Sequence, residues 1–199
     1  MRWSIVLLLH NMFLLFLLLL LLSGNQASGA ETAPYRTLAN PCAGCHGTNG
    51  YSMQPMPIIA GLTPAYLNTT MQKYKTGKRA STIMGRIAKG YSDDEIAAIT
   101  SFFASQYWLS PVQQVDPMLV ERGRRLHLDK CETCHQDNGR YQDDKTPRLA
   151  GQWREYLEIV LQEYWQPERH MGDLFMKLVL RPLRPEDLNA LAHFYASYK

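Results

Sequence analysis

The 199-residue sequence has few cysteines, little net charge and only one long apolar run. Four cysteines are too few for a small protein held together by disulfides. A formal net charge of +3, with no basic tail, does not by itself indicate nucleic-acid binding. No segment alternates in polarity as a half-buried strand would, and no G-x-G-x-x-G motif occurs for a flavin or nicotinamide cofactor. With 46% apolar and 20% charged residues, the chain has the composition of a globular protein, and we expect it to be helical.

The one long apolar run lies at the N-terminus and is typical of an export signal. Arg2 precedes it, and residues 12–22 are apolar without interruption. Eleven residues match the apolar region of a signal peptide and are too few to span a bilayer. Small residues then offer a cleavage site after Gly29 or Ala30. We predict a signal peptide over residues 1–29. An uncleaved anchor is the alternative, and the chain is exported in both cases.

The rest of the chain repeats itself. A C-x-x-C-H motif at residues 42–46 recurs 89 residues later, at residues 131–135. Further matches follow at offsets of 90 and 92 residues, the last between residues 102–105 and 194–197. The slow drift indicates two copies of one fold that differ by short insertions. We therefore predict two domains, over residues 31–109 and 118–199, joined by a proline-containing linker over residues 110–117.

Each copy carries the start signals of helices and no signal of a strand. Thr63-Pro64 and Asp116-Pro117 each place a capping residue before a proline, and Ser92 with Glu95 forms a capping box. Pro185 begins the last helix, so the predicted fold is all-α, twice. A copy of roughly 80 residues is near the size at which an apolar core alone is marginal. We expect something besides side chains to complete each core.

The pattern C-x-x-C-H is the attachment signature of haem c. The two thiols bond to the two vinyl groups of one haem, and the adjacent histidine binds the iron from one face. A thioredoxin-like redox pair needs a βαβ context, and a zinc site needs its cysteine pairs closer together in sequence. Two local disulfides would leave both histidines unexplained. We predict two covalently bound haem c groups, with these attachment and proximal residues: Cys42, Cys45, His46, Cys131, Cys134 and His135.

The second axial ligand of each iron is predicted from the repeat. Met84 and Met176 are the methionines that coincide when the copies are overlaid, and a thioether is the usual partner of histidine in cytochromes of this type. Met171 is the alternative in the second copy, and either methionine could instead fill core space. Other candidates in the two copies are less favoured: Met53, Met56, His127, His170 and His193.

The surroundings of the two histidines can also be predicted. A ligating imidazole usually donates its second N–H to a carbonyl, which Pro57 and Pro147 could supply from matched loops, unless both are plain turn prolines. Six aromatic residues could wall the haem pockets or serve as ordinary core: Tyr66, Tyr74, Trp153, Tyr156, Tyr164 and Trp165. Two six-coordinate haems leave no open position for a substrate, which favours electron transfer over catalysis by this chain alone.

Five segments together resemble the dihaem cytochrome subunit of flavocytochrome c sulfide dehydrogenase. They span most of the chain after the signal segment: residues 42–47, 81–92, 123–127, 150–153 and 194–197. The resemblance implies two tandem class I cytochrome c domains, with His46 and Met84 on the first iron and His135 and Met176 on the second. It also implies a periplasmic location, a flavoprotein partner that carries FAD and oxidises sulfide, and a soluble cytochrome c as electron acceptor.

Two features depart from that resemblance. The spacing of Met171 and Met176 is unusual, and Leu62 in the first copy is replaced by Gln152 in the second. The two-copy plan is also shared with free periplasmic dihaem shuttle cytochromes, which need no flavoprotein. A third interpretation is a dihaem peroxidase or thiosulfate-oxidising enzyme. It needs one exchangeable iron site, and the two matched methionines count against it.

Overall fold

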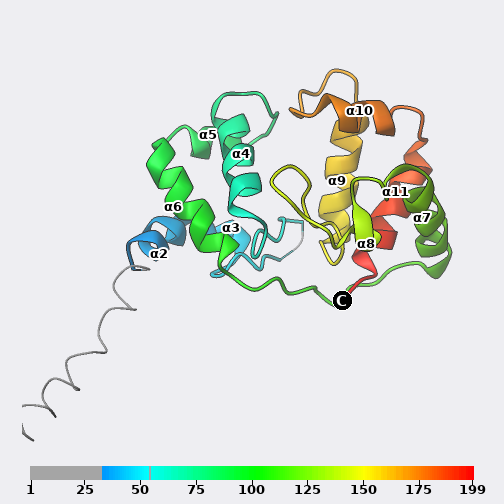
Figure 1. Cartoon of the computed structure of the whole chain (residues 1–199), viewed down its shortest axis with the longest axis horizontal. Helices are drawn as coiled ribbons and strands as arrows, with labels where there is room; N and C mark the ends of the chain where they lie inside the picture. The colour runs from blue at the N-terminus through cyan, green and yellow to red at the C-terminus, as the bar shows by residue number, and fades with distance from the viewer. Residues whose placement is uncertain (1–32, 54) are drawn as a thin grey trace, which may run out of the picture.

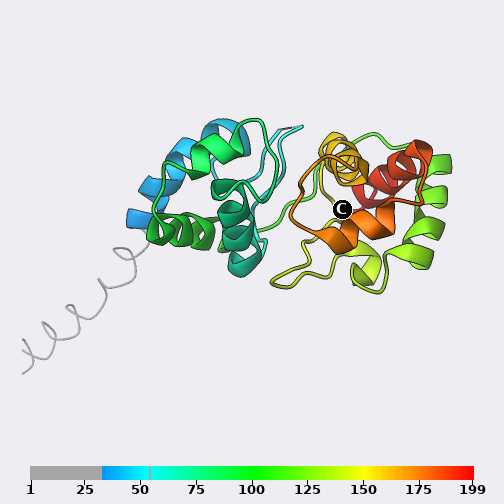
Figure 2. The ribbon, with the colours of Figure 1, turned by 90° about the horizontal axis from the view of Figure 1, so that it is seen from above.

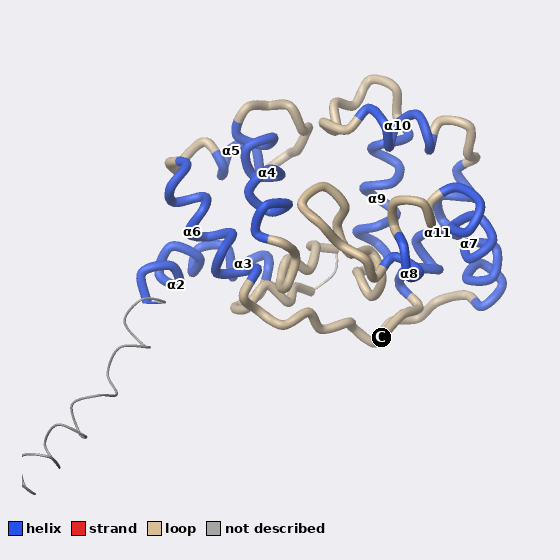
Figure 3. The backbone as a smooth tube through the Cα atoms, viewed as in Figure 1, coloured by secondary structure: helices blue, strands red, loops and turns tan. Residues whose placement is uncertain are grey.

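The computed structural model describes residues 33–53 and 55–199, and within these ranges it contains helices and loops but no strand (Figure 3). The all-α prediction is therefore confirmed. The predicted signal peptide and its cleavage site lie outside the described residues. Over the part of the chain that the structure describes, no helix is long and apolar enough to cross a membrane.

Apart from the short helices near the two C-x-x-C-H motifs, the helices follow the same order in each half of the chain (Figure 1). The first half contains α2 (Ala33–Ala39), the 3₁₀ helix η1 (Asn40–Cys42), α3 (Ala43–His46), α4 (Pro64–Lys75), α5 (Met84–Ala88) and α6 (Asp93–Ala104). The second half contains α7 (Pro117–Lys130), α8 (Gln136–Gly139), α9 (Arg154–Trp165), α10 (Leu174–Leu180) and α11 (Pro185–Ala196). Helices α2, α4, α5 and α6 pack together, as do α7, α9, α10 and α11, and the two groups lie side by side (Figure 2). The boundaries at 109 and 118 stay a prediction.

The predicted helix starts are present. The Thr63 side chain accepts a hydrogen bond from the N–H of Tyr66 at the start of α4. Ser92 and Glu95 form the reciprocal capping box of α6. The carboxylate of Asp116 accepts the N–H of Met118 at 2.7 Å at the start of α7. These caps satisfy N–H groups that have no partner within their own helix.

The repeat is reproduced hydrogen bond by hydrogen bond in the loop that follows each C-x-x-C-H motif. In the first half, the carbonyl of Gly50 accepts the N–H of Ile59 at 2.9 Å and of Ala60 at 3.2 Å. In the second half, the carbonyl of Gly139 accepts the N–H of Leu149 at 2.8 Å and of Ala150 at 2.9 Å. Both glycines have φ = +82°, a conformation that other residues rarely adopt. The matched offsets in the sequence therefore correspond to one loop built twice.

Each half has its own apolar core. The first is formed by five residues of α2, α4, α6 and the preceding loop: Ala39, Leu62, Leu67, Ile99 and Phe103. The second is larger and centres on α9 and α11, where Leu157, Leu191 and Tyr195 are buried. Helix α7 crosses α11 at Gly123, where an added Cβ would lie 2.1 Å from the carbonyl oxygen of Ala190. Gly123 thus permits the close approach on which the second core depends.

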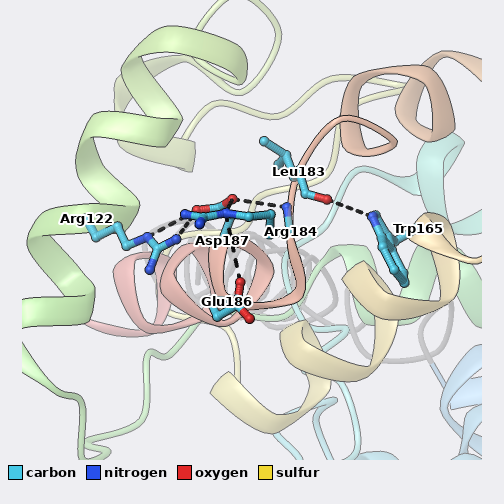
Figure 4. A network of polar contacts seen from close by, with 6 residues as sticks. All are labelled: Arg122, Trp165, Leu183, Arg184, Glu186 and Asp187. Carbon is cyan, nitrogen blue, oxygen red and sulfur yellow. Dashed lines mark hydrogen bonds and ion pairs between the residues drawn. The ribbon is translucent and has the colours of Figure 1, made fainter.

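A polar network closes the outer side of the second half (Figure 4). Asp187 of α11 accepts hydrogen bonds from Arg122 of α7, at 3.1 and 2.5 Å, and from the backbone N–H of Arg184, at 3.0 Å. The indole N–H of Trp165 donates to the carbonyl of Leu183 at 2.9 Å, which ties the end of α9 to the loop before α11. Burial alone would raise the pKa of Asp187, but these donors outweigh it and hold the pKa below its ordinary value.

The two halves are joined by buried hydrogen bonds as well as by the linker. The amide of Gln152 binds both backbone groups of Ile58, accepting the N–H and donating to the carbonyl, each at 2.9 Å. The indole N–H of Trp153 donates to the carbonyl of Ser52 at 3.1 Å. The hydroxyl of Thr63 donates to the carbonyl of Asp143 at 3.0 Å. Because the hydrogen bonds between Gln152 and Ile58 are buried, water cannot take the place of either residue if the other loses it as a partner.

We expect Asp187→Asn to lower the free energy of unfolding by roughly 1–3 kcal/mol, because it leaves partly buried donors of Arg122 and Arg184 unpaired. The depressed pKa of Asp187 contributes stability above the unfolded pKa of about 3.8, and this contribution is lost as the pH falls through the folded pKa. Urea unfolding of wild type and variant between pH 7 and pH 3 tests both points. A variant with wild-type stability and an unchanged acid limb would contradict them.

We expect Gln152→Leu, which restores the residue type of the first copy, to lower the free energy of unfolding by about 2–4 kcal/mol, because two backbone groups of Ile58 lose their partners. It should also increase proteolytic cleavage between the two halves. Gln162→Leu on the exposed face of α9 is the matched control and should change neither quantity. Equal effects of the two substitutions would show that the Gln152 bonds do not hold the halves together.

Candidate haem sites

One continuous cavity of about 870 Å³ extends between and into both halves of the chain. Its walls are largely apolar and come from α4, α5 and α6 of the first half and α9, α10 and α11 of the second. All eight predicted attachment and ligand residues line it: Cys42, Cys45, His46, Met84, Cys131, Cys134, His135 and Met176. The structure therefore brings the residues of both predicted sites to one interior space.

The cysteines are presented as free thiols by tight turns. None of the four forms a disulfide. Cys45 and His46 lie in α3, directly after Cys42, and the N–H groups of Cys134 and His135 donate to the carbonyl of Cys131 at 3.1 and 2.8 Å. Residues three apart on such a turn face the same side. Burial raises the pKa of the Cys42 and Cys131 thiols, so both are protonated at neutral pH.

His46 is held in a form that suits a metal ligand. The imidazole is 8% exposed, and its Nδ1 atom lies 3.0 Å from the carbonyl oxygen of Pro57. Because a carbonyl only accepts, Nδ1 carries the proton and Nε2 keeps a free lone pair. Burial lowers the pKa of His46 against the opposing effect of that carbonyl, which keeps the ring neutral. The carbonyl partner that we predicted at Pro57 is present.

His135 is equally buried and less well satisfied. Burial, followed by the neighbouring His127, lowers its pKa to about 4, although the carbonyl of Pro147 acts in the opposite direction. The Nδ1 atom of His135 nevertheless has no hydrogen bond of normal geometry. A buried polar atom without a partner is uncommon in folded proteins and marks a place where another group is needed or where the ring must shift.

The two matched methionines both lie in the first turn of a short helix. Met84 is the first residue of α5, and Met176 lies in the first turn of α10, where its N–H donates to Asp173 at 3.1 Å. Met171 also lines the cavity and is 1% exposed. Met171 lies five residues before Met176. The residue five positions before Met84 is Arg79, so the equivalent of Met171 in the first copy is an arginine.

All of the less favoured ligand candidates except Met56 are engaged elsewhere or stand apart from the cavity. The ring of His127 is buried between α7 and α11, bound to the Tyr195 hydroxyl at 2.9 Å and to Glu132. Nδ1 of His193 accepts the N–H of Asp116 at 2.9 Å. Neither ring lines the cavity, nor does Met53, which is 82% exposed, whereas Met56 does line it.

The aromatic candidates divide cleanly. Four tyrosines line the cavity: Tyr66, Tyr74, Tyr156 and Tyr164. Trp153 and Trp165 do not, and their indole N–H groups bind the backbone carbonyls of Ser52 and Leu183. Helical spacing does not separate the two sets, but the overlay of the two copies does. Tyr66 matches Tyr156 and Tyr74 matches Tyr164 at an offset of 90 residues, whereas neither tryptophan has an aromatic equivalent at that offset.

Sequence reasoning missed two residues of the site. Arg79 lines the cavity although it is only 7% exposed. Gln152 binds Ile58 next to Pro57, so it holds the segment whose carbonyl orients His46. The overlay of the two copies contained a signal for each, since Arg79 matches Met171 and Gln152 matches Leu62. A residue that differs between the two copies does not by itself show which group it contacts.

Haem c fits this site. The cavity has the size and apolar walls for a large planar cofactor, and its rim carries two pairs of unoxidised thiols at the attachment spacing. Two neutral imidazoles line the same space, and thioethers lie at equivalent positions along it. These are the donors that haem iron takes in cytochromes c.

Comparisons with known proteins agree. The cytochrome c family matches residues 35–106. The chain is 30% identical to cytochrome c4 of Pseudomonas aeruginosa over 92% of this chain and 97% of that protein. The structure of reduced recombinant cytochrome c4 from Pseudomonas stutzeri superimposes with a TM-score of 0.75 at 27% identity, covering 85% of this chain and 99% of that one.

Two relatives are named for sulfur oxidation. The cytochrome subunit of sulfide dehydrogenase from Chlorobaculum tepidum is 47% identical over 68 residues, which are 34% of this chain and 62% of that protein. The thiosulfate dehydrogenase electron acceptor of Stutzerimonas stutzeri is 29% identical over 89% of this chain and 90% of that protein. The likeness to the sulfide dehydrogenase subunit thus spans less than two thirds of that protein, whereas the likeness to cytochrome c4 and to the thiosulfate dehydrogenase electron acceptor spans nine tenths or more of each. The chain belongs to the cytochrome c family, with two class I domains as in the dihaem cytochromes c4, and it transfers electrons rather than acting as an enzyme by itself.

Proposed function

We propose that this chain is a two-haem relay that accepts electrons from a sulfide-oxidising flavoprotein and passes them to a soluble cytochrome c. The observation that carries the relay is the continuous cavity, since both C-x-x-C-H motifs line one interior space. The identity of the donor is supported by the 47% identity to a cytochrome subunit of sulfide dehydrogenase. In this proposal FAD belongs to the partner, because this sequence has no dinucleotide-binding motif of its own.

The residues that would hold the cofactor follow from the repeat. Haem c supplies reversible one-electron transfer when it is bound. In the first half we assign attachment to Cys42 and Cys45 and axial ligation to His46 and Met84. In the second half we assign attachment to Cys131 and Cys134 and axial ligation to His135 and Met176.

The protein's own contribution is positioning and exclusion of water. The carbonyl of Pro57 fixes the tautomer of His46 and thereby the nitrogen that faces a metal. The tyrosines of α4 and α9 cover the cavity from either side. Through the N-terminal apolar run, we also propose export to the periplasm with removal of residues 1–29.

A second candidate is a free shuttle without a flavoprotein subunit. It is supported by the likeness to cytochrome c4 along almost the whole chain and by the likeness to an electron acceptor of thiosulfate dehydrogenase. Both candidates use the same two haem sites, and they differ only in the donor and in the lifetime of the complex with it.

The donor is tested by purifying the untagged chain from its native periplasm. We expect two haems per chain and a co-purifying flavoprotein whose flavin absorption is bleached by sulfide while the haems become reduced. Two haems in a monomer that sulfide does not rapidly reduce would reject the flavoprotein partner and favour the shuttle. Adding a thiosulfate dehydrogenase and thiosulfate to that monomer then tests the second donor.

The axial ligands are tested by replacing one methionine at a time. We expect Met84→Ala and Met176→Ala each to remove about half of the Met–iron absorption band while leaving both haems covalently attached, because thioether attachment does not depend on the sixth ligand. Met171→Ala is the control and should keep the full band. A band lost in the Met171 variant and kept in the Met176 variant would reverse the assignment in the second half.

A further inference from the structure

Arg79 carries a positive charge that the described protein does not balance. Its side chain lies in the cavity and is 7% exposed, and its Nε atom has no hydrogen-bond partner. Among the described residues, no carboxylate lies close enough to form an ion pair with it. Burying an unpaired charge costs several kcal/mol, so such a group normally has a counter-ion.

The groups around Arg79 are tyrosines from both halves. The guanidinium stands over the ring of Tyr74, 5.0 Å from its centroid, and Tyr66 lies on the same helix, α4. Tyr156 and Tyr164 approach from α9. Burial raises the pKa of Tyr74, Tyr156 and Tyr164, so none of these hydroxyls supplies the missing negative charge at neutral pH.

Arg79 lies where the two halves meet. The loop after α4 touches the loop before α10, with the N–H of Ala80 donating to the carbonyl of His170 at 2.5 Å (Figure 1). A Cβ added to Gly172 would lie 3.0 Å from the carbonyl oxygen of Lys78. The loops are equivalents in the repeat, and their equivalent residues are Arg79 and Met171, so the cation is supplied only once.

We propose that Arg79 binds a propionate carboxylate of the haem held in the first half, with tyrosine hydroxyls of both halves completing the site. This inference rests on the proposed haem sites and goes beyond them. Every haem c carries two propionates, which are the anions that this cavity would receive. The planar fork of an arginine matches a carboxylate with two parallel hydrogen bonds, and the unpartnered Nε is one of its donors.

The proposal has an electrostatic consequence. A buried positive charge favours the reduced iron, because reduction adds one negative charge nearby. Met171 offers no such charge in the second half. Arg79 therefore raises the reduction potential of one haem and makes the two haems unequal.

The test uses the purified, haem-loaded full chain and needs no electron donor partner. Arg79→Met gives the first loop the residue of the second. We expect a shift of the propionate bending band in the resonance Raman spectrum and a lower midpoint potential for one haem in a redox titration. Arg36→Met, the same substitution at an exposed arginine of the same half, should change neither.

Arg79→Lys keeps the charge and removes the fork. We expect it to shift the propionate band while holding the potential nearer to wild type, and it serves as the test if the methionine variant does not fold. An unchanged propionate band in the variants would overturn the proposal, even if the potential falls. Failure of the proposed relay would show instead as a wrong haem count or an absent donor, which these spectra of the isolated chain do not measure.

Discussion

The helices of this protein surround an interior space that their side chains do not fill. Without a cofactor, a cavity of about 870 Å³ would forfeit dispersion contacts along its walls, and a domain of roughly 80 residues has little stability with which to offset that loss. The short helices α5 and α10 both line the cavity, and Leu180 at the end of α10 also belongs to the second core. Covalent attachment of haem at the C-x-x-C-H motifs makes the cofactor part of the core, so the stability of the fold depends on cofactor binding.

The same constraint explains why the two copies differ where they face each other. The equivalent loops before α5 and α10 meet where the N–H of Ala80 donates to the carbonyl of His170, so a second arginine there would need a second counter-ion. Gln152 takes both backbone groups of Ile58, and its equivalent Leu62 belongs to the apolar core. Arg79 and its equivalent Met171 both line the cavity. Because the two copies differ at these two pairs of positions, the two haem sites have different surroundings.

What the sequence could predict was local or repeated. Attachment motifs, helix caps and matched methionines each depend on spacing within a few residues or on the offset between copies. The positions of Gln152, Arg79 and His127 depend on partners far away in the chain, such as the 68 residues between His127 and Tyr195. No periodicity encodes such a pairing. Nor does any periodicity place Trp153 against the other half, where its ring lies beside that of Tyr51.

The position of Arg79 also links cofactor binding to the docking of the two halves. Its backbone belongs to the first half, whereas Tyr156 and Tyr164 belong to the second. Docking the halves removes water from the guanidinium, and this is unfavourable until a carboxylate compensates the charge. A haem bound in the first half supplies that carboxylate and so favours the docked arrangement. The same contact brings the second attachment motif to the shared cavity. The relative placement of the two haem sites therefore depends on a buried charge that the cofactor itself compensates.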